Sequence, residues 1–129
     1  MNIKEISKEI HQNNIYKGFW EDKETKNVGE VLMLCVSELS EALEAHRKGK
    51  FADLDNFTES MKGFTVEDSR ISFEHEFKRD IKDSFEDEIA DTVIRLFDLC
   101  EGFGIDLETH IRLKTGYNKT RPFKHGKKY

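Results

Sequence analysis

The sequence predicts an all-α protein, a bundle of four to five helices. Apolar residues recur at three- and four-residue steps over long stretches, whereas alternation of apolar and polar residues over four or more positions is nearly absent. The chain has 129 residues and a mass of 15.1 kDa, which is the size of one domain with a single hydrophobic core. We therefore expect residues 1–129 to form one helical domain.

The two strongest helices are expected at residues 28–48 and 85–103. In the first, apolar side chains follow alternating four- and three-residue steps, and in the second a similar row ends in a glycine-containing segment. Asn27 is suited to cap the first helix, and Gly49 is suited to end it. Gly102 and Gly104 have the same role at the end of the second helix.

The remaining helices are shorter and less clearly bounded. They are expected at residues 3–12, at residues 73–83, and from Asp106 as a cap to Leu113 or Tyr117. Asn13 and Asn14 indicate that a loop follows the first of them. Residues 50–71 have no clear period, and their apolar side chains, Phe64 among them, fit a short helix or an ordered loop.

The composition excludes several classes of protein. No stretch approaches the ~18 apolar residues of a membrane helix, and 10 Phe residues are too many for a disordered acidic chain. The opening residues MNIKEISKEI mix Lys with Glu, unlike a signal peptide. Two cysteines, Cys35 and Cys100, form neither a disulfide framework nor a zinc site and are expected to be buried free thiols. A cytoplasmic protein without a membrane partner is expected.

The net charge of −5 is unevenly distributed. Residues 53–91 hold 13 acidic and 5 basic side chains, whereas residues 109–129 hold 7 basic and no acidic ones. A solvated helix face and an exposed tail would explain this pattern. A site that holds a metal in carboxylates and steadies phosphates with basic side chains would explain both halves together. The acidic middle would repel a phosphate backbone, so no nucleic acid polymer is expected as a partner.

Glu38 and Glu41 lie in the first strong helix, within the segment ELSEALE. At ~100° per residue Glu38 falls inside the apolar arc and Glu41 at its edge, and an i, i+3 pair can converge. An ionised carboxylate in an apolar arc is strongly unfavourable unless it is protonated, paired with a base or bound to a metal. An interhelical salt bridge to Arg95 or Lys114 is therefore the structural alternative to a metal site.

The second strong helix repeats this spacing with Glu88 and Asp91. They are either ordinary surface acids, as we expect Asp87 and Asp98 to be, or half of a carboxylate cluster. Facing the first pair, they would give three or four carboxylates in one pocket, which cannot all stay ionised without cations. Oxygen ligands without His or Cys favour Mg²⁺ or Mn²⁺. No histidine has Glu three residues before it, which disfavours a di-iron bundle.

Two further features are candidates for substrate contacts. The basic tail KTGYNKTRPFKHGKKY could meet phosphate oxygens or serve as a solubilising tail. Its candidates are Lys114, Asn118, Lys119, Arg121 and Lys124. Phe19 and Trp20 could stack on a base or pack in the core.

In these segments the sequence resembles the MazG-like nucleotide pyrophosphohydrolases of the all-α NTP pyrophosphatase superfamily. The resembling stretches are VGEVLMLCVSELSEALEAHRKGK, FEDEIADTVIRLFDLCEGFGIDLE and the basic tail. The family pattern of Glu-x-x-Glu followed by Glu-x-x-Asp falls on Glu38, Glu41, Glu88 and Asp91. The segment between the motifs, residues 50–84, is longer than in compact members and is expected to be an insertion that forms an added helix, a lid or a subunit contact.

The resemblance implies a MazG-like bundle that hydrolyses NTPs or dNTPs to the monophosphate and pyrophosphate, and so clears non-standard or deoxynucleotides. Glu38, Glu41, Glu88 and Asp91 would hold Mg²⁺ or Mn²⁺, with Glu38 and Glu41 catalytic and Glu41 taking the proton of the attacking water. Lys114, Asn118, Arg121 and Lys124 would orient the substrate, with Trp20 against the base. A homodimer or homotetramer is implied. The alternative is a non-catalytic helical module that binds nucleotides or proteins.

Overall fold

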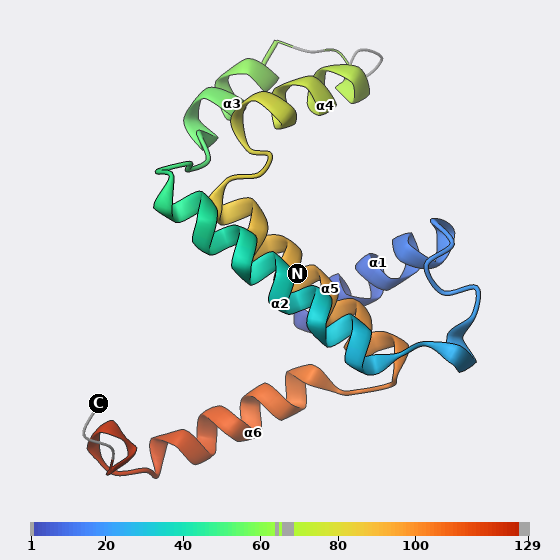
Figure 1. Cartoon of the computed structure of the whole chain (residues 1–129), viewed down its shortest axis with the longest axis vertical. Coiled ribbons are helices and arrows are strands. Elements are labelled where there is room, and N and C mark those ends of the chain that lie inside the picture. Colours follow the sequence, from blue (N-terminus) through green and yellow to red (C-terminus); the bar gives the residue numbers. More distant parts are fainter. Residues whose placement is uncertain (1, 64, 66–68, 127–129) are drawn as a thin grey trace. The chain divides into compact units, whose positions relative to one another are not determined.

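A computed structural model describes residues 2–63, 65 and 69–126; Phe64 and the last three tail residues lie outside this description. The regular elements of the described residues are all helical, which confirms the all-α prediction, but there are six α-helices rather than four or five. None of these described helices is long and apolar enough to cross a membrane. The chain divides into a central unit, Asn27–Arg95, and a terminal unit, Met1–Lys26 with Leu96–Tyr129 (Figure 1).

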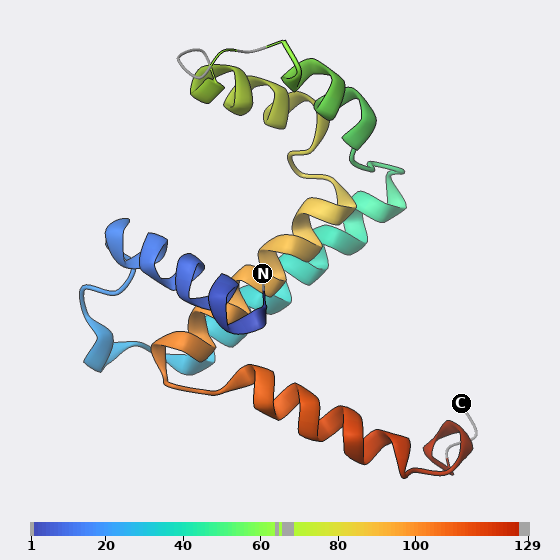
Figure 2. The ribbon, with the colours of Figure 1, turned by 180° about the vertical axis from the view of Figure 1, so that it is seen from behind.

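The central unit is built on α2 (Val28–Arg47) and the first half of α5 (Phe85–Gly102). As predicted, the Asn27 side chain caps α2 by accepting a hydrogen bond from the Glu30 N–H at 3.2 Å, and the chain leaves the helix through Gly49 at φ 67°. The N–H of Phe85 then donates to the Lys50 carbonyl at 2.9 Å. Because α5 begins where α2 ends, the two helices run antiparallel and side by side (Figures 1 and 2).

The segment between α2 and α5 forms a helical hairpin of α3 (Leu54–Met61) and α4 (Ser69–Asp80). The first helix lies in the segment without a clear period, and the second both begins and ends earlier than the predicted 73–83. Phe73 lies 5.6 Å from Phe57 and 5.9 Å from Phe77 between ring centroids. The contact between Phe57 and Phe73 holds the two short helices together, so the insertion is an added pair of helices.

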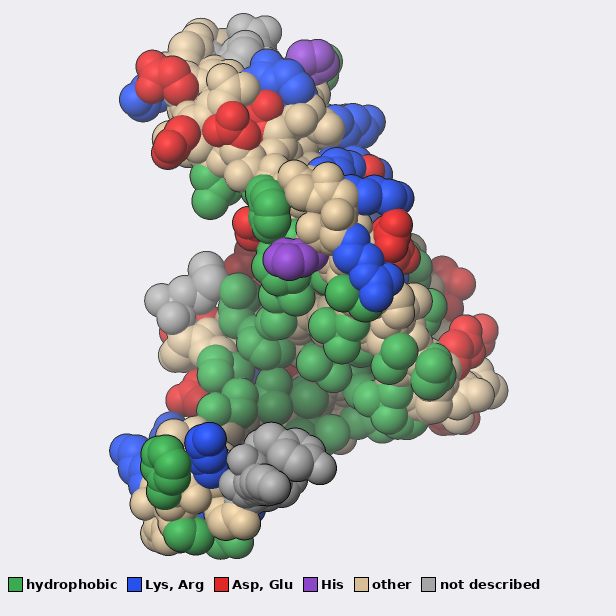
Figure 3. Space-filling model, turned by 60° about the vertical axis from the view of Figure 1, so that its left-hand side comes forward, with side chains coloured by type: hydrophobic (Ala, Val, Ile, Leu, Met, Phe, Trp, Pro, Cys, Tyr) green, Lys and Arg blue, Asp and Glu red, His purple; other side chains and the backbone are tan. Residues whose placement is uncertain are grey.

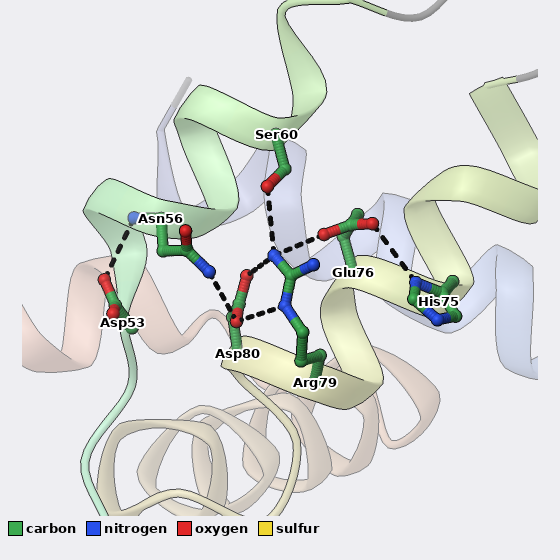
Figure 4. A network of polar contacts seen from close by, with 7 residues as sticks. All are labelled: Asp53, Asn56, Ser60, His75, Glu76, Arg79 and Asp80. Carbon is green, nitrogen blue, oxygen red and sulfur yellow. Dashed lines mark hydrogen bonds and ion pairs between the residues drawn. The ribbon is translucent and has the colours of Figure 1, made fainter.

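A polar network joins α3 to α4 on the same hairpin (Figure 4). The Arg79 guanidinium donates to both carboxylate oxygens of Asp80, at 2.8 and 2.6 Å, and to the Ser60 hydroxyl at 3.0 Å. It also forms an ion pair with the buried Glu76, and the Asn56 amide donates to Asp80 at 3.0 Å. The Arg79 hydrogen bond lowers the pKa of Asp80. This cluster of acidic side chains around one arginine is therefore structural.

The terminal unit contains α1 (Ile3–Tyr16), the 3₁₀ turn η1 (Lys23–Thr25), the end of α5, α6 (Leu107–Lys119) and the 3₁₀ turn η2 (Phe123–Gly126). The predicted loop at Asn13 and Asn14 is wrong, because α1 continues through both residues. Asp106 caps α6 as predicted, accepting from the Thr109 N–H at 3.0 Å. The helix runs beyond Tyr117, its latest predicted end.

Asp98 is the polar centre of this unit, and the prediction that it is an ordinary surface acid is wrong. Its carboxylate lies 2.7 Å from His11 Nδ1 and accepts from the Asn14 amide at 2.8 Å and from the Trp20 indole N–H at 2.9 Å. The Trp20 ring is 8% exposed and packs edge-on against His11 and Phe103. One carboxylate thus fixes the loop after α1 against α5.

Replacing Gly102 with Ala is expected to destabilise the protein by about 1–3 kcal/mol through overpacking. A Cβ at this position would overlap the Trp20 ring, which Asp98 holds in place. The control is Gly116→Ala in α6, where a Cβ has open space and the change should stabilise the helix by up to ~1 kcal/mol. Urea denaturation of both variants measures the difference, and an equal effect of the two substitutions would contradict this packing.

Candidate functional site

Acidic side chains from α2 and α5 meet in the central unit. Glu38 is 7% exposed and Glu88 is 5% exposed, whereas Asp91 is open to solvent. The helical period explains the first two: Glu38 shares its face of α2 with the buried Cys35 and Ala42. Thr92, one turn after Glu88, is also buried. Two carboxylates are therefore carried into the contact between α2 and α5.

The carboxylates of Glu38, Glu88 and Asp91 converge closely. One oxygen from each lies within 4.8 Å of the others. Arg95 provides a positive charge beside them, donating to Glu38 Oε1 from Nη2 at 2.6 Å and from Nε at 2.8 Å. The interhelical salt bridge that the sequence offered as an alternative is therefore formed, and its partner is Arg95. Three carboxylates and one guanidinium leave the cluster with excess negative charge when all are ionised.

Burial together with this excess charge changes the acidity of two groups. Burial, followed by the negative charges of Glu41, Glu38, Asp91 and Asp87, raises the pKa of Glu88 to about 7. Burial also raises the pKa of Asp91, with repulsion from Asp87 and Glu38 adding to the effect and Arg95 opposing it. A carboxyl group that titrates near neutrality can hold or release a proton at physiological pH. A divalent cation in the cluster would favour the ionised forms.

Glu41 is exposed and lies at the edge of this cluster. It lines an open pocket in the central unit together with Glu88 and Asp83. Two lysines line the same pocket. The Lys48 ammonium lies 3.3 Å from Glu44 Oε1, and the Lys50 ammonium lies 3.5 Å from Asp83 Oδ2. The pocket beside the carboxylates thus offers positive charge as well as negative.

Lys48 and Lys50 are pocket residues that were not predicted from the sequence. Basic side chains at the end of a helix complement its dipole, which is a sufficient reason for Lys48. The sequence also holds a stronger indication that Lys48 belongs to the site. Lys48 follows Glu41 by two helical turns and therefore lies on the same side of the helix. Lys50 reaches the pocket only because Gly49 turns the chain back. That change of direction is a tertiary feature.

The remaining candidates lie in the terminal unit. The ammonium of Lys114 and the guanidinium of Arg121 lie over the Tyr117 ring, 5.2 and 5.9 Å from its centroid, and Lys124 lies 5.8 Å from the Phe123 centroid. Asn118 is exposed on α6. Their contact with a substrate stays a prediction. Trp20 requires a correction as a base-stacking candidate, because its ring is enclosed and its N–H is bonded to Asp98.

Comparison of the chain with models of known protein families, with curated proteins and with solved structures finds no match. Inference about its activity therefore depends on the residues of the cluster and the pocket. The geometry brings together Glu38, Glu88 and Asp91 from two helices, with Glu41 beside them. It adds one arginine and two lysines that are suited to contact an anion.

Proposed function

We propose that this protein is a metal-dependent nucleoside triphosphate pyrophosphohydrolase with a MazG-like bundle. It hydrolyses the anhydride between the α- and β-phosphates of an NTP or dNTP and releases the monophosphate and pyrophosphate, which suits it to remove unwanted nucleotides. The observation that carries the proposal is the convergence of three carboxylates from two helices, two of them buried and one with a pKa near 7. Such groups cluster at functional sites.

The donor set fits a hard divalent cation, Mg²⁺ or Mn²⁺. The candidate ligands are all carboxylates, and the exposure of Asp91 gives a cation access from solvent. Glu38, Glu41, Glu88 and Asp91 would hold it. The Arg95 ion pair leaves the second oxygen of Glu38 for this role, since Nε and Nη2 of Arg95 both contact Oε1. When bound, the cation would offset the phosphate charge that develops during hydrolysis.

The chain's own residues have two tasks in this reaction. Glu41, with Glu38 behind it, takes a proton from the attacking water. The oxygen of that water bonds to phosphorus as the bridging P–O bond breaks, and the pyrophosphate leaves with the bridging oxygen. Lys48 and Lys50 are placed to contact phosphate oxygens from the pocket wall, and Lys114, Asn118, Arg121 and Lys124 are further candidates from the tail. A homodimer or homotetramer of a cytoplasmic enzyme is part of this proposal.

The test is pyrophosphate release from a panel of NTPs and dNTPs with Mg²⁺. We expect release with at least one nucleotide and a loss of about 100-fold or more in Asp91→Asn, which keeps the side chain's shape but removes its charge. Glu9→Gln, an exposed position on α1, is the matched control and should keep full activity. No release with any nucleotide, or equal rates in the two variants, would refute the proposal.

A non-catalytic helical module that binds nucleotides or proteins is the second candidate, and the Glu38–Arg95 ion pair favours it. This pair already neutralises one buried carboxylate without a metal. Thermal unfolding separates the two functions. A metal site predicts that millimolar Mg²⁺ or Mn²⁺ raises the melting temperature of the wild type but not of Asp91→Asn. The non-catalytic module predicts that adding the cation changes the melting temperature of the wild type no more than that of Asp91→Asn.

A further inference from the structure

Along α2, basic side chains lie on one side of Glu41 only. Lys48 follows Glu41 by two helical turns, or about 10 Å along the helix axis, and Lys50 lines the same pocket. In the opposite direction, residues 28–40 of α2 contain no Lys, Arg or His. A substrate that lies along α2 therefore meets basic side chains of this segment only toward the α3–α4 hairpin.

Lys50 is fixed at this end of the pocket by its backbone and by its side chain. Its N–H donates to the Ala45 carbonyl at 2.9 Å, and its carbonyl accepts from the Phe85 N–H at 2.9 Å. Its ammonium lies 3.5 Å from Asp83 Oδ2. Asp83 itself has φ 56°, and its N–H donates to Asp87 Oδ2 at 2.9 Å. The two connections between the hairpin and the helix pair thus hold this lysine at the pocket before any ligand binds.

The pocket is large enough for two linked phosphate groups. Its volume is about 290 Å³, which is room for on the order of ten water molecules. Figure 3 shows Lys and Arg side chains gathered with acidic ones where the hairpin joins the helix pair. The carboxylates that line the pocket outnumber its two lysines. A phosphate chain is therefore expected to enter together with the proposed divalent cation rather than alone.

The chemistry of the proposed reaction gives this basic end a specific role. Water adds to the α-phosphorus, its proton passes to Glu41, and the pyrophosphate leaves with the bridging oxygen and its electron pair. The attacking and leaving oxygens lie roughly in line on opposite sides of the phosphorus. With the water at Glu41, the pyrophosphate therefore departs on the far side, where fixed positive charge best offsets its developing negative charge.

We propose that the end of the pocket at Lys48 and Lys50 is the subsite for the leaving pyrophosphate, and that the nucleoside points toward the earlier turns of α2. This assignment rests on the proposed hydrolase function. The earlier turns offer the nucleoside an uncharged surface, because Leu34, 39% exposed, and Ser37 lie within ~40° of Glu41 around the helix.

The subsite makes the length of the phosphate chain a determinant of substrate choice. A nucleoside triphosphate places two phosphates beyond the reacting phosphorus, one for each lysine, whereas a diphosphate places only one there. Nucleoside diphosphates should therefore be poor substrates. Pyrophosphate itself should bind at the two lysines and compete with the triphosphate.

Calorimetric titration of the full chain with magnesium pyrophosphate tests the subsite without requiring catalysis. The wild type should bind it, and Lys48→Met/Lys50→Met should bind it at least about tenfold more weakly, because charge-assisted contacts are lost. Both lysines are exposed, so this variant should fold. The control is Arg47→Met/Lys62→Met, which removes two exposed charges of the same unit that do not line the pocket. Its affinity should stay within about twofold of the wild type.

The possible results distinguish the subsite from the hydrolase function. A wild type that does not bind pyrophosphate, or equal affinities of the two double variants, would overturn the subsite even if nucleotides are hydrolysed. Titration with a nucleoside monophosphate checks the direction of the substrate. If Lys48→Met/Lys50→Met lost affinity for the monophosphate but not for pyrophosphate, the substrate would lie the other way round and the assignment would be wrong. Pyrophosphate binding that depends on the two lysines, in a protein that hydrolyses no nucleotide, would support pyrophosphate recognition and refute the hydrolase.

Discussion

Replacing Arg95 with Met is expected to destabilise the protein by about 3 kcal/mol. The substitution keeps the aliphatic stem of the side chain but leaves Glu38, 7% exposed, without its positive partner. The nearby carboxylates of Glu88 and Asp91 add repulsion. Guanidinium chloride or urea denaturation measures the loss as a lower midpoint with an unchanged slope.

Two controls distinguish the effect of leaving a buried charge unpaired from the effect of removing an arginine in general. Arg112→Met removes an exposed helical ion pair with Glu108 and should change the stability by less than about 1 kcal/mol. The double variant Glu38→Gln/Arg95→Met should be more stable than Arg95→Met alone, because the unpaired charge is gone. A stability of Arg95→Met within about 0.5 kcal/mol of the wild type would contradict the assigned ion pair.

The same variant bears on the proposed metal site. Without Arg95, the excess negative charge of the cluster is larger, so a divalent cation that binds there should stabilise Arg95→Met more than the wild type. A melting temperature that responds equally weakly to Mg²⁺ in both proteins would favour a purely structural cluster.

The helices that carry the cluster were predictable because their signals are local. The apolar period of α2, its Asn27 cap and its Gly49 stop all agree with one another, and the burial of Glu38 follows from the helical wheel. Helix α3 has only eight residues, and its aromatic side chain Phe57 packs against Phe73 of α4, 16 residues further along the chain, so the local period gives little signal. The period therefore left this hairpin undefined.

Long-range contacts explain the features that the sequence did not predict. Asp98 was expected at the surface because its position on α5 lies off the apolar row. Its donors come from residues 78 to 87 positions away. The same contacts enclose Trp20, which local sequence could not distinguish from an exposed aromatic. For Glu38, the sequence identified the need for a partner and named Arg95 among two, but only the packing of α2 on α5 selects it.

Glu88→Gln is expected to make the protein more stable at alkaline pH than the wild type. The pKa of Glu88 is raised from an ordinary value of 4.5 to about 7 in the folded protein, mainly by burial. Below pH 4.5 the group is protonated in both states, so the substitution has little effect. Between pH 4.5 and 7 the unfolded chain releases this proton while the folded protein retains it. Folding therefore becomes less favourable as the pH rises.

The difference between the two proteins should grow to on the order of 3 kcal/mol at pH 8, since one pKa unit corresponds to about 1.4 kcal/mol. Glu9→Gln should show no such growth, because Glu9 is exposed on α1. Denaturation curves from pH 4 to pH 8 without divalent cations supply the comparison. If Mg²⁺ binds the cluster, its addition at pH 8 should stabilise the wild type and reduce the advantage of Glu88→Gln, since the ionised carboxylate then gains a partner. A difference that stays constant with pH would show that the pKa of Glu88 is the same in the folded and the unfolded protein, and that burial beside the neighbouring acids does not control its charge.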